Sequence, residues 1–298
     1  MSQYNSVTTY YEFESKHSVR EYEIWYERIL KASEPMIIFV EPKSRWANFT
    51  REHRNHAPTI IASQEFNNIT MVDTFSESFW DYEHSIDTEA RIHKGSNVYK
   101  IWNQKMIYLY ATVQLNPFDT DGFIWMDAGY FRKEHMAPKL SKPILHVNLT
   151  DLGVPREKML FLHVRNDDLE SEARVNIAGN SYFGTKDALL AFYFQYYLTF
   201  WDWVKKKNKF IGSDQFVLTE TCRRYPMNCH PYFGGGFRWW FAFADKVFLG
   251  KDLTVNKVSP HYLFLDEPPT DLEEVPDGQR VSYCNGTIVT SVSYDFGC

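Results

Sequence analysis

The chain has 298 residues, 44% of them hydrophobic, which is enough to bury one large core or two closely merged halves. The formal net charge is −6 and the sequence pI is about 5.9. Extended nucleic acid is therefore excluded as an expected partner, because phosphate contacts dominate such binding and require a basic face. A small anionic ligand stays possible, since a few placed Lys or Arg side chains suffice for it.

No targeting or membrane segment is expected in the sequence. Residues 1–9 are polar and lack the apolar region of a signal peptide. The most apolar stretch, Ala188 to Val204, contains Gln195 and Asp202 and falls short of the roughly 20 apolar residues of a membrane span. We therefore expect the chain as given to be soluble, in the cytoplasm or, if an anchor was removed, in the lumen of the secretory pathway.

The first part of the chain alternates short apolar runs with helical periodicity, which is typical of an α/β fold with a largely parallel sheet. The continuous apolar run Met36 to Val40 suits a strand buried on both faces. In chain order we predict a strand at 6–11, a helix at 18–31, a strand at 36–40, a strand at 69–73 and a helix from Ser96 or Asn97 to about Leu115.

The remaining part continues the same alternation. We predict strands at 122–127 and 159–164, a segment 176–184 that leads into a long aromatic helix at about 186–207, and a second helix from Ser213 to just before Pro226. The tail from Met227 to Cys298 is expected to be irregular. Four cysteines, all in the last third, lack zinc-ligand spacing and fit two disulfides or four thiols equally well. No linker or repeat interrupts the chain, so we predict one domain.

Several common catalytic motifs are absent from the sequence. There is no Gly-x-Gly-x-x-Gly fingerprint and no Gly-x-x-x-x-Gly-Lys-Ser/Thr loop, which argues against the usual dinucleotide and P-loop sites. Gly-x-Ser-x-Gly and His-Glu-x-x-His are also missing, so neither a serine hydrolase nor a zinc protease is indicated.

The most informative segment is 123–132, where an apolar strand ends on Asp127. Ligands bind at the carboxyl ends of strands in open α/β sheets, and a carboxylate there can hold a ribose hydroxyl or a divalent cation. Gly129 would allow backbone to approach a ligand closely, and Arg132 could bind phosphate through two hydrogen bonds. An Asp that caps a turn explains the spacing equally well.

Two further positions carry a weaker signal. Lys105 lies on an otherwise apolar stripe of its helix, so it either extends its amine to the surface, the commoner case, or meets an anion. Asp214 and Gln215 follow Ser213 at a helix start, which ordinary capping explains. The functional alternative is that Asp214 faces a reacting sugar and Gln215 binds its hydroxyls.

Taken together, these residues resemble the HtrL/YibB family of predicted glycosyltransferases, which is related to the GT-A fold. The resemblance is carried by the order and spacing of several short runs, namely 7–11, 15–18 with Tyr22 and Trp25, 102–105, 116–118, 125–129 with Arg132, 178–184 and 212–215.

The resemblance implies a nucleotide-sugar donor in the first half of the chain, about 1–132, and a glycan or other hydroxyl acceptor against the second half, about 133–298. Asp127 takes the first acidic position of an Asp-x-Asp motif that holds Mn²⁺ or Mg²⁺, whereas the second acidic position is Gly129. Asp214 would be a general base or would stabilise an oxocarbenium-like state. The implied site residues are Thr8, Ser15, Lys16, Asn103, Lys105, Asp127, Gly129 and Arg132 for the donor, Gly179 and Asn180 for the acceptor, Asp214 and Gln215 for catalysis, and Asp127 for the metal.

Two other functional classes stay open from the sequence. The chain could be a non-catalytic protein that binds a nucleotide sugar or carbohydrate on the same fold, for which Gly129 is the main support. It could also be a structural protein whose 188–204 helix docks on a membrane or a partner. That hypothesis predicts an exposed apolar helix face.

Overall fold

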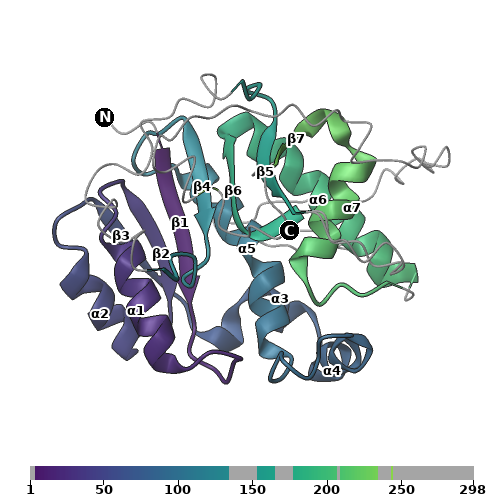
Figure 1. Ribbon diagram of the computed structural model, residues 1–298, viewed down its shortest axis with the longest axis horizontal. Coiled ribbons are helices and arrows are strands. Elements are labelled where there is room, and N and C mark those ends of the chain that lie inside the picture. Colours follow the sequence, from purple (N-terminus) through teal and green to yellow (C-terminus); the bar gives the residue numbers. More distant parts are fainter. Residues whose placement is uncertain (1–3, 134–152, 165–176, 207–208, 234–242, 244–298) are drawn as a thin grey trace, which may run out of the picture.

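A seven-stranded mixed sheet forms the centre of the protein, with helices packed on it (Figure 1). The computed structural model describes residues 4–133, 153–164, 177–206, 209–233 and 243. The strand order is β3-β2-β1-β4-β6-β5-β7. Within the described residues, the predicted single-domain α/β fold with a mostly parallel sheet is confirmed. The irregular tail predicted from Met227 to Cys298 is wrong at its start, because residues 229–233 form a strand of the sheet. The rest of that tail, apart from Phe243, lies outside the described residues, and Cys284 and Cys298 lie there too.

The first half of the sheet is parallel. It comprises β1 (Tyr4–Tyr10), β2 (Met36–Val40), β3 (Thr59–Ser63) and β4 (Gly122–Met126). The chain moves outward from β1 to β2 and β3, and then returns to place β4 on the other side of β1. The strand order thus reverses between β1 and β4. In open α/β sheets, the crevice outside the carboxyl ends of two such strands is where ligands bind.

The second half contains an antiparallel strand that the sequence did not predict. β6 (Ile177–Thr185) runs antiparallel between β4 and β5 (Met159–His163), and β7 (Cys229–Phe233) pairs parallel with β5. Because of its direction, β6 brings its first residues to the carboxyl end of β4, where Ser181 pairs with Met126. Glycine, asparagine and serine fill much of this strand, so its sequence lacks the usual strand composition.

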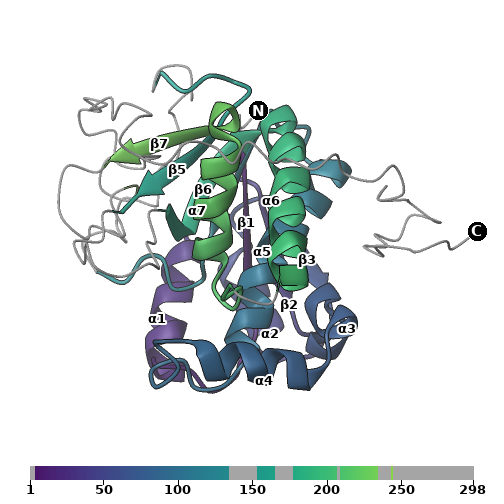
Figure 2. The ribbon, with the colours of Figure 1, turned by 90° about the vertical axis from the view of Figure 1, so that its right-hand side faces the viewer.

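Helices cover both faces of the sheet. On one face, α1 (Val19–Leu30) and α2 (Arg45–His53) share a hydrophobic cluster with alternate residues of β2 and β4, such as Ile38 and Ile124. On the other face, α5 (Asn97–Leu115), α6 (Lys186–Lys206) and α7 (Asp214–Arg224) pack with Phe123 and Trp125 (Figure 2). The shorter elements are η1 (Phe66–Asn68), α3 (Thr70–Thr74), α4 (Glu77–Ile86) and η3 (Pro226–Asn228).

The strand predicted at 69–73 is wrong, because these residues enter α3. The third strand is instead Thr59–Ser63, which follows Pro58 at the edge of the sheet. Ile69 and Met71 are both buried, so their alternation resembles that of a strand. A five-residue segment carries too short a pattern to separate one helical turn from a strand.

The long aromatic helix α6 directs most of its rings into the core. Phe192, Tyr196 and Phe200 are almost fully buried, whereas Phe194 is exposed. This burial argues against a helix that docks a broad apolar face on a membrane. None of the helices in the described ranges combines the length and apolarity of a membrane span.

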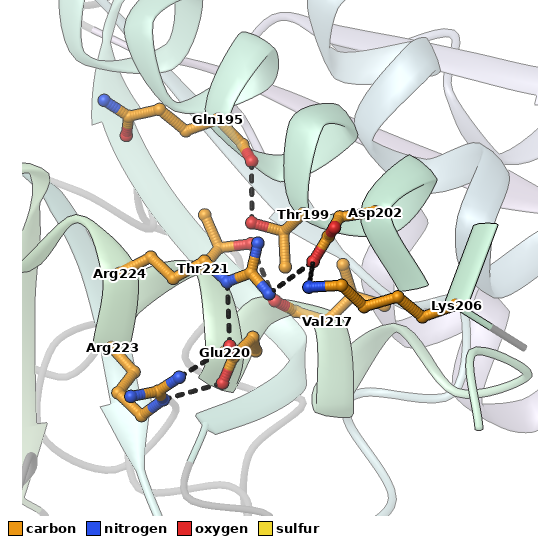
Figure 3. A network of polar contacts seen from close by, with 9 residues as sticks. All are labelled: Gln195, Thr199, Asp202, Lys206, Val217, Glu220, Thr221, Arg223 and Arg224. Atoms are coloured by element: carbon orange, nitrogen blue, oxygen red, sulfur yellow. Dashed lines mark hydrogen bonds and ion pairs between the residues drawn. The ribbon is translucent and has the colours of Figure 1, made fainter. Parts of the chain in front are cut away.

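Ion pairs and a disulfide hold the C-terminal end of α7 against neighbouring elements. Arg224 donates from Nη2 to Oδ2 of Asp202 on α6 at 2.7 Å, and from Nε to Oε1 of Glu220 at 2.8 Å (Figure 3). A disulfide between Cys222 and Cys229 joins α7 to β7. These contacts hold α7 in place, and its first residue, Asp214, reaches the edge of the sheet where β4 ends.

Candidate active site

The candidate site is built around the ammonium group of Lys105, which is buried among carboxylate and carbonyl oxygen atoms. Nζ lies 2.9 Å from Oδ1 of Asp127 and 3.0 Å from Oδ2 of Asp214. It also donates to the carbonyl oxygen of Gly179 at 2.9 Å. Lys105 is only 3% exposed, so its amine does not reach the surface and meets anions, the less common of the two alternatives. Burial alone lowers the pKa of Lys105, but the two carboxylates outweigh that effect and raise it.

Asp127 follows the last residue of β4 and is the more accessible of the two acids. Its side chain is 29% exposed, compared with 5% for Asp214. The indole Nε1 of Trp125 donates to Oδ1 at 2.8 Å, and the backbone N–H of Asp127 donates to the carbonyl oxygen of Asn180 at 2.9 Å. Strand β6 therefore fixes the backbone of Asp127, while Trp125 and Lys105 orient its carboxylate.

Asp214 opens α7 beneath this surface. The pKa of Asp214 is raised to about 6; burial is the largest cause, Lys105 lowers the pKa, and the negative charge of Asp127 raises it. A carboxyl group whose pKa lies near neutral pH can accept and return a proton under physiological conditions. Two carboxylates in different environments around one amine are a pattern typical of catalytic sites.

Gly179 permits the close approach of β6 to α7. A Cβ atom at this position would lie 2.7 Å from both carboxylate oxygens of Asp214. Any larger residue would therefore push the acid away from Lys105. The predicted acceptor-side residues Gly179 and Asn180 are thus brought to the site, where their backbone carbonyl groups bind Lys105 and Asp127.

The segment before Asp214 is held by two side chains from other helices. Asn103 on α5 donates from Nδ2 to the carbonyl oxygen of Ile211 at 2.9 Å and accepts from Tyr196. Glu83 on α4 accepts from the backbone N–H groups of Ile211 and Gly212 at 2.8 and 3.2 Å. Asn103 is fully buried, so the structure places it behind the site rather than at a ligand surface. Glu83 was not found from the sequence, because a single acid in a helix carries no distinguishing pattern.

A cluster of basic side chains, Lys16, His17 and Arg132, borders the same edge of the sheet, which we call the basic rim. Nη1 of Arg132 donates to Nε2 of His17 at 3.1 Å, and its guanidinium lies 4.7 Å from the ring centroid of Trp25. Burial lowers the pKa of Lys16, and the charge of Arg132 lowers it further. The same causes, with the charge of Lys16 added, lower the pKa of His17. Lys16 and Arg132, whose positive charges disfavour one another, are suited to an anionic ligand.

The remaining predicted site residues differ in their burial and in what they contact. Thr8 lies inside β1 and is fully buried, so its side chain faces no ligand surface. Ser15 lies in the loop after β1, where its hydroxyl donates to the carbonyl oxygen of His17 at 2.9 Å. Gly129 is buried against Trp25, and Gln215 is half-buried on the first turn of α7.

The described ranges contain no group of three His, Cys, Asp or Glu side chains arranged to hold a metal ion. Asp127 and Asp214 share Lys105, so the charge between them is already provided by the protein. Comparison with known protein families finds no matching family model, and no curated protein matches the chain.

Proposed function

We propose that this protein is a glycosyltransferase that moves a sugar from a nucleotide-sugar donor to a hydroxyl group of a glycan or other acceptor. The observation that carries the proposal is the position of Asp127, a partly exposed acid at the carboxyl end of β4, where the strand order reverses. The basic rim lies at the same edge and offers positive charge to a diphosphate. The proposal also rests on the resemblance of segments 125–132 and 212–215 to glycosyltransferases of the GT-A type.

Such a transfer requires little covalent chemistry from the protein itself. The nucleoside diphosphate leaves with developing negative charge, which Lys16 and Arg132 would stabilise. Asp127 would accept hydrogen bonds from hydroxyl groups of the donor and fix its orientation. Asp214, with its pKa near 6, would take the proton of the attacking hydroxyl group if substrate binding opens a path to it.

The burial of Asp214 favours a second candidate, a protein that binds a nucleotide sugar without transferring it. A general base must come within hydrogen-bond reach of the acceptor, yet the side chain of Asp214 is 5% exposed. The two candidates share the donor site and differ only in whether nucleoside diphosphate is released.

Calorimetric titration with UDP-, GDP-, CMP- and dTDP-sugars tests the shared donor site. We expect one donor to bind the wild type and to bind Asp127→Asn at least about tenfold more weakly, which corresponds to about 1.4 kcal/mol. Asp121→Asn is the matched control, because Asp121 is exposed and immediately precedes the opposite end of β4. If no donor binds, or if Asp127→Asn binds as the wild type does, the donor site is not at this edge.

A further inference from the structure

We infer that the ammonium group of Lys105 takes the place of a divalent cation at this site, so that the protein binds its nucleotide sugar without Mn²⁺ or Mg²⁺. This inference rests on the proposed function for the identity of the ligand. Its structural basis, the occupation of the position between two carboxylates by an amine of the same chain, is independent of that function.

The two acids do not fit a metal ion while Lys105 lies between them. An ammonium group has three N–H donors, and four oxygen atoms surround Nζ of Lys105: Oδ1 and Oδ2 of Asp127 at 2.9 and 3.3 Å, Oδ2 of Asp214 at 3.0 Å and the carbonyl oxygen of Gly179 at 2.9 Å. A divalent cation bound by Asp127 and Asp214 would have to displace this buried amine or lie against its positive charge. Both alternatives are costly, because charges interact strongly where water is excluded.

The two carboxylate oxygens of Asp127 already have partners within the protein. Oδ1 faces Nζ of Lys105 at 2.9 Å and accepts from Nε1 of Trp125 at 2.8 Å, while Oδ2 lies 3.3 Å from the same Nζ. Mg²⁺ requires oxygen ligands at about 2.0 to 2.1 Å and keeps several water molecules in its shell. A cation at Oδ1 would therefore compete with an indole N–H and an amine at once.

The second acidic position of an Asp-x-Asp motif cannot readily hold an acidic side chain that would bind the metal. Gly129 lies there, and a Cβ atom on it would approach the ring of Trp25 to 3.2 Å and that of Tyr22 to 3.3 Å. These distances are tighter than ordinary van der Waals contact, so aromatic packing of α1 on the loop after β4 excludes a longer acidic side chain without rearrangement. The same loop is tied to α1 by Arg28, whose Nη1 donates to the carbonyl oxygen of Arg132 at 2.7 Å.

The positive charge that a metal would present to a diphosphate is available from the basic rim. Arg132 is held by its own Nε, which donates to the carbonyl oxygen of Gly129 at 3.1 Å, and by its position over Trp25. A guanidinium fixed in this way loses little conformational entropy when it binds phosphate. Lys105 thus balances one of the two negative charges, and Lys16 with Arg132 meets the ligand.

The test measures binding of Mn²⁺ alone, by the loss of the electron paramagnetic resonance signal of free Mn²⁺ as protein is added at neutral pH. We expect wild type, Asp127→Asn and Asp121→Asn to leave the same free Mn²⁺. In Lys105→Met, which keeps the stem and removes the charge, we expect a Mn²⁺ site that Lys105→Met/Asp127→Asn loses. Binding of one Mn²⁺ by the wild type that Asp127→Asn abolishes would overturn the inference, as would a folded Lys105→Met that gains no Mn²⁺.

A second measurement keeps the inference testable if Lys105→Met does not fold. The affinity of the wild type for the nucleotide sugar is compared in EDTA and in Mn²⁺ by calorimetry. An affinity that changes by less than about threefold supports the inference, and a larger gain in Mn²⁺ overturns it. If no nucleotide sugar binds in either buffer, the proposed function fails, whereas the Mn²⁺ titration without nucleotide still decides the role of Lys105.

Discussion

Nζ of Lys105 lies 2.9 Å from Oδ1 of Asp127, so the middle of α5 provides the cation for the acid at the end of β4. The same amine reaches Asp214 at the start of α7. One side chain therefore links the first, parallel half of the sheet to α7, the second helix after the antiparallel strand. The stability of the fold and the geometry of the candidate site depend on the same contact.

Replacing Lys105 by Met should destabilise the protein by about 3–5 kcal/mol, because the buried carboxylate of Asp214 and the partly exposed carboxylate of Asp127 lose their shared cation. Urea unfolding of the purified variant measures this loss. Lys206→Met is the control, since Lys206 forms an exposed i,i+4 pair with Asp202 at 3.1 Å and should cost less than about 0.5 kcal/mol. Equal losses of stability in the two variants would show that Lys105 stabilises the protein no more than an exposed ion pair does.

The stability difference between the wild type and Asp214→Asn should change with pH. The folded-state pKa of Asp214, about 6, lies above its ordinary value of 3.8, so the folded protein holds the proton more tightly than the unfolded chain. The carboxyl group therefore favours folding least above pH 6, and the wild type should lose stability relative to Asp214→Asn as the pH rises from about 4 to about 6. Denaturant unfolding of both proteins across this range provides the measurement. A constant difference would contradict the raised pKa.

Gly179→Ala should destabilise the protein more than Gly129→Ala. At position 179 a methyl group would meet both oxygens of Asp214 at 2.7 Å, whereas at position 129 it would lie 3.2 Å from Trp25. Overpacking of this kind costs about 1–3 kcal/mol, and the larger value is expected at position 179. Thermal unfolding of the two variants gives the comparison. The reverse order would mean that Asp214 can move aside without loss.

Glu83→Ala should cost about 2–4 kcal/mol, because it leaves the N–H groups of Ile211 and Gly212 buried without an acceptor. Glu83→Gln keeps an oxygen that can accept from both groups and should lose much less. Denaturant unfolding distinguishes the two variants. If Gln is as harmful as Ala, the charge of Glu83 matters and its acceptor role is not the reason for its burial.

The sequence predicted β1, α1, β2, α5 and β4, because periodic apolar patterns are clear in these segments. The helices at 19–30 and 97–115 and the strands at 36–40 and 122–126 lie within two residues of the predicted bounds. The edge strands β3 and β7, the antiparallel strand β6 and the helices α2 and α4 were missed. In β6, glycine and asparagine serve close approach to Asp214 and Asp127 rather than strand propensity, so the local pattern points away from the observed structure.

The site was predictable in part. Asp127, Asp214 and Lys105 were each singled out, but their mutual contact depends on β6, whose direction no local pattern reveals. Lys105 seemed more suited to a surface position, because an isolated sequence does not show which acids will face a lysine on a buried helix. Thr8 and Asn103 were selected by resemblance, and both are fully buried.

The most direct test of the proposed transferase is the release of nucleoside diphosphate from the donor that binds, followed with purified wild type, Asp214→Asn and the control Asp121→Asn. If the account is right, the wild type and Asp121→Asn release it at similar rates, and Asp214→Asn is slower by about 10²-fold or more, the usual contribution of a general base. Release by Asp214→Asn at the wild-type rate would contradict the assignment of Asp214. If a donor binds the wild type but no acceptor leads to release of nucleoside diphosphate, the protein is a binding protein and not an enzyme.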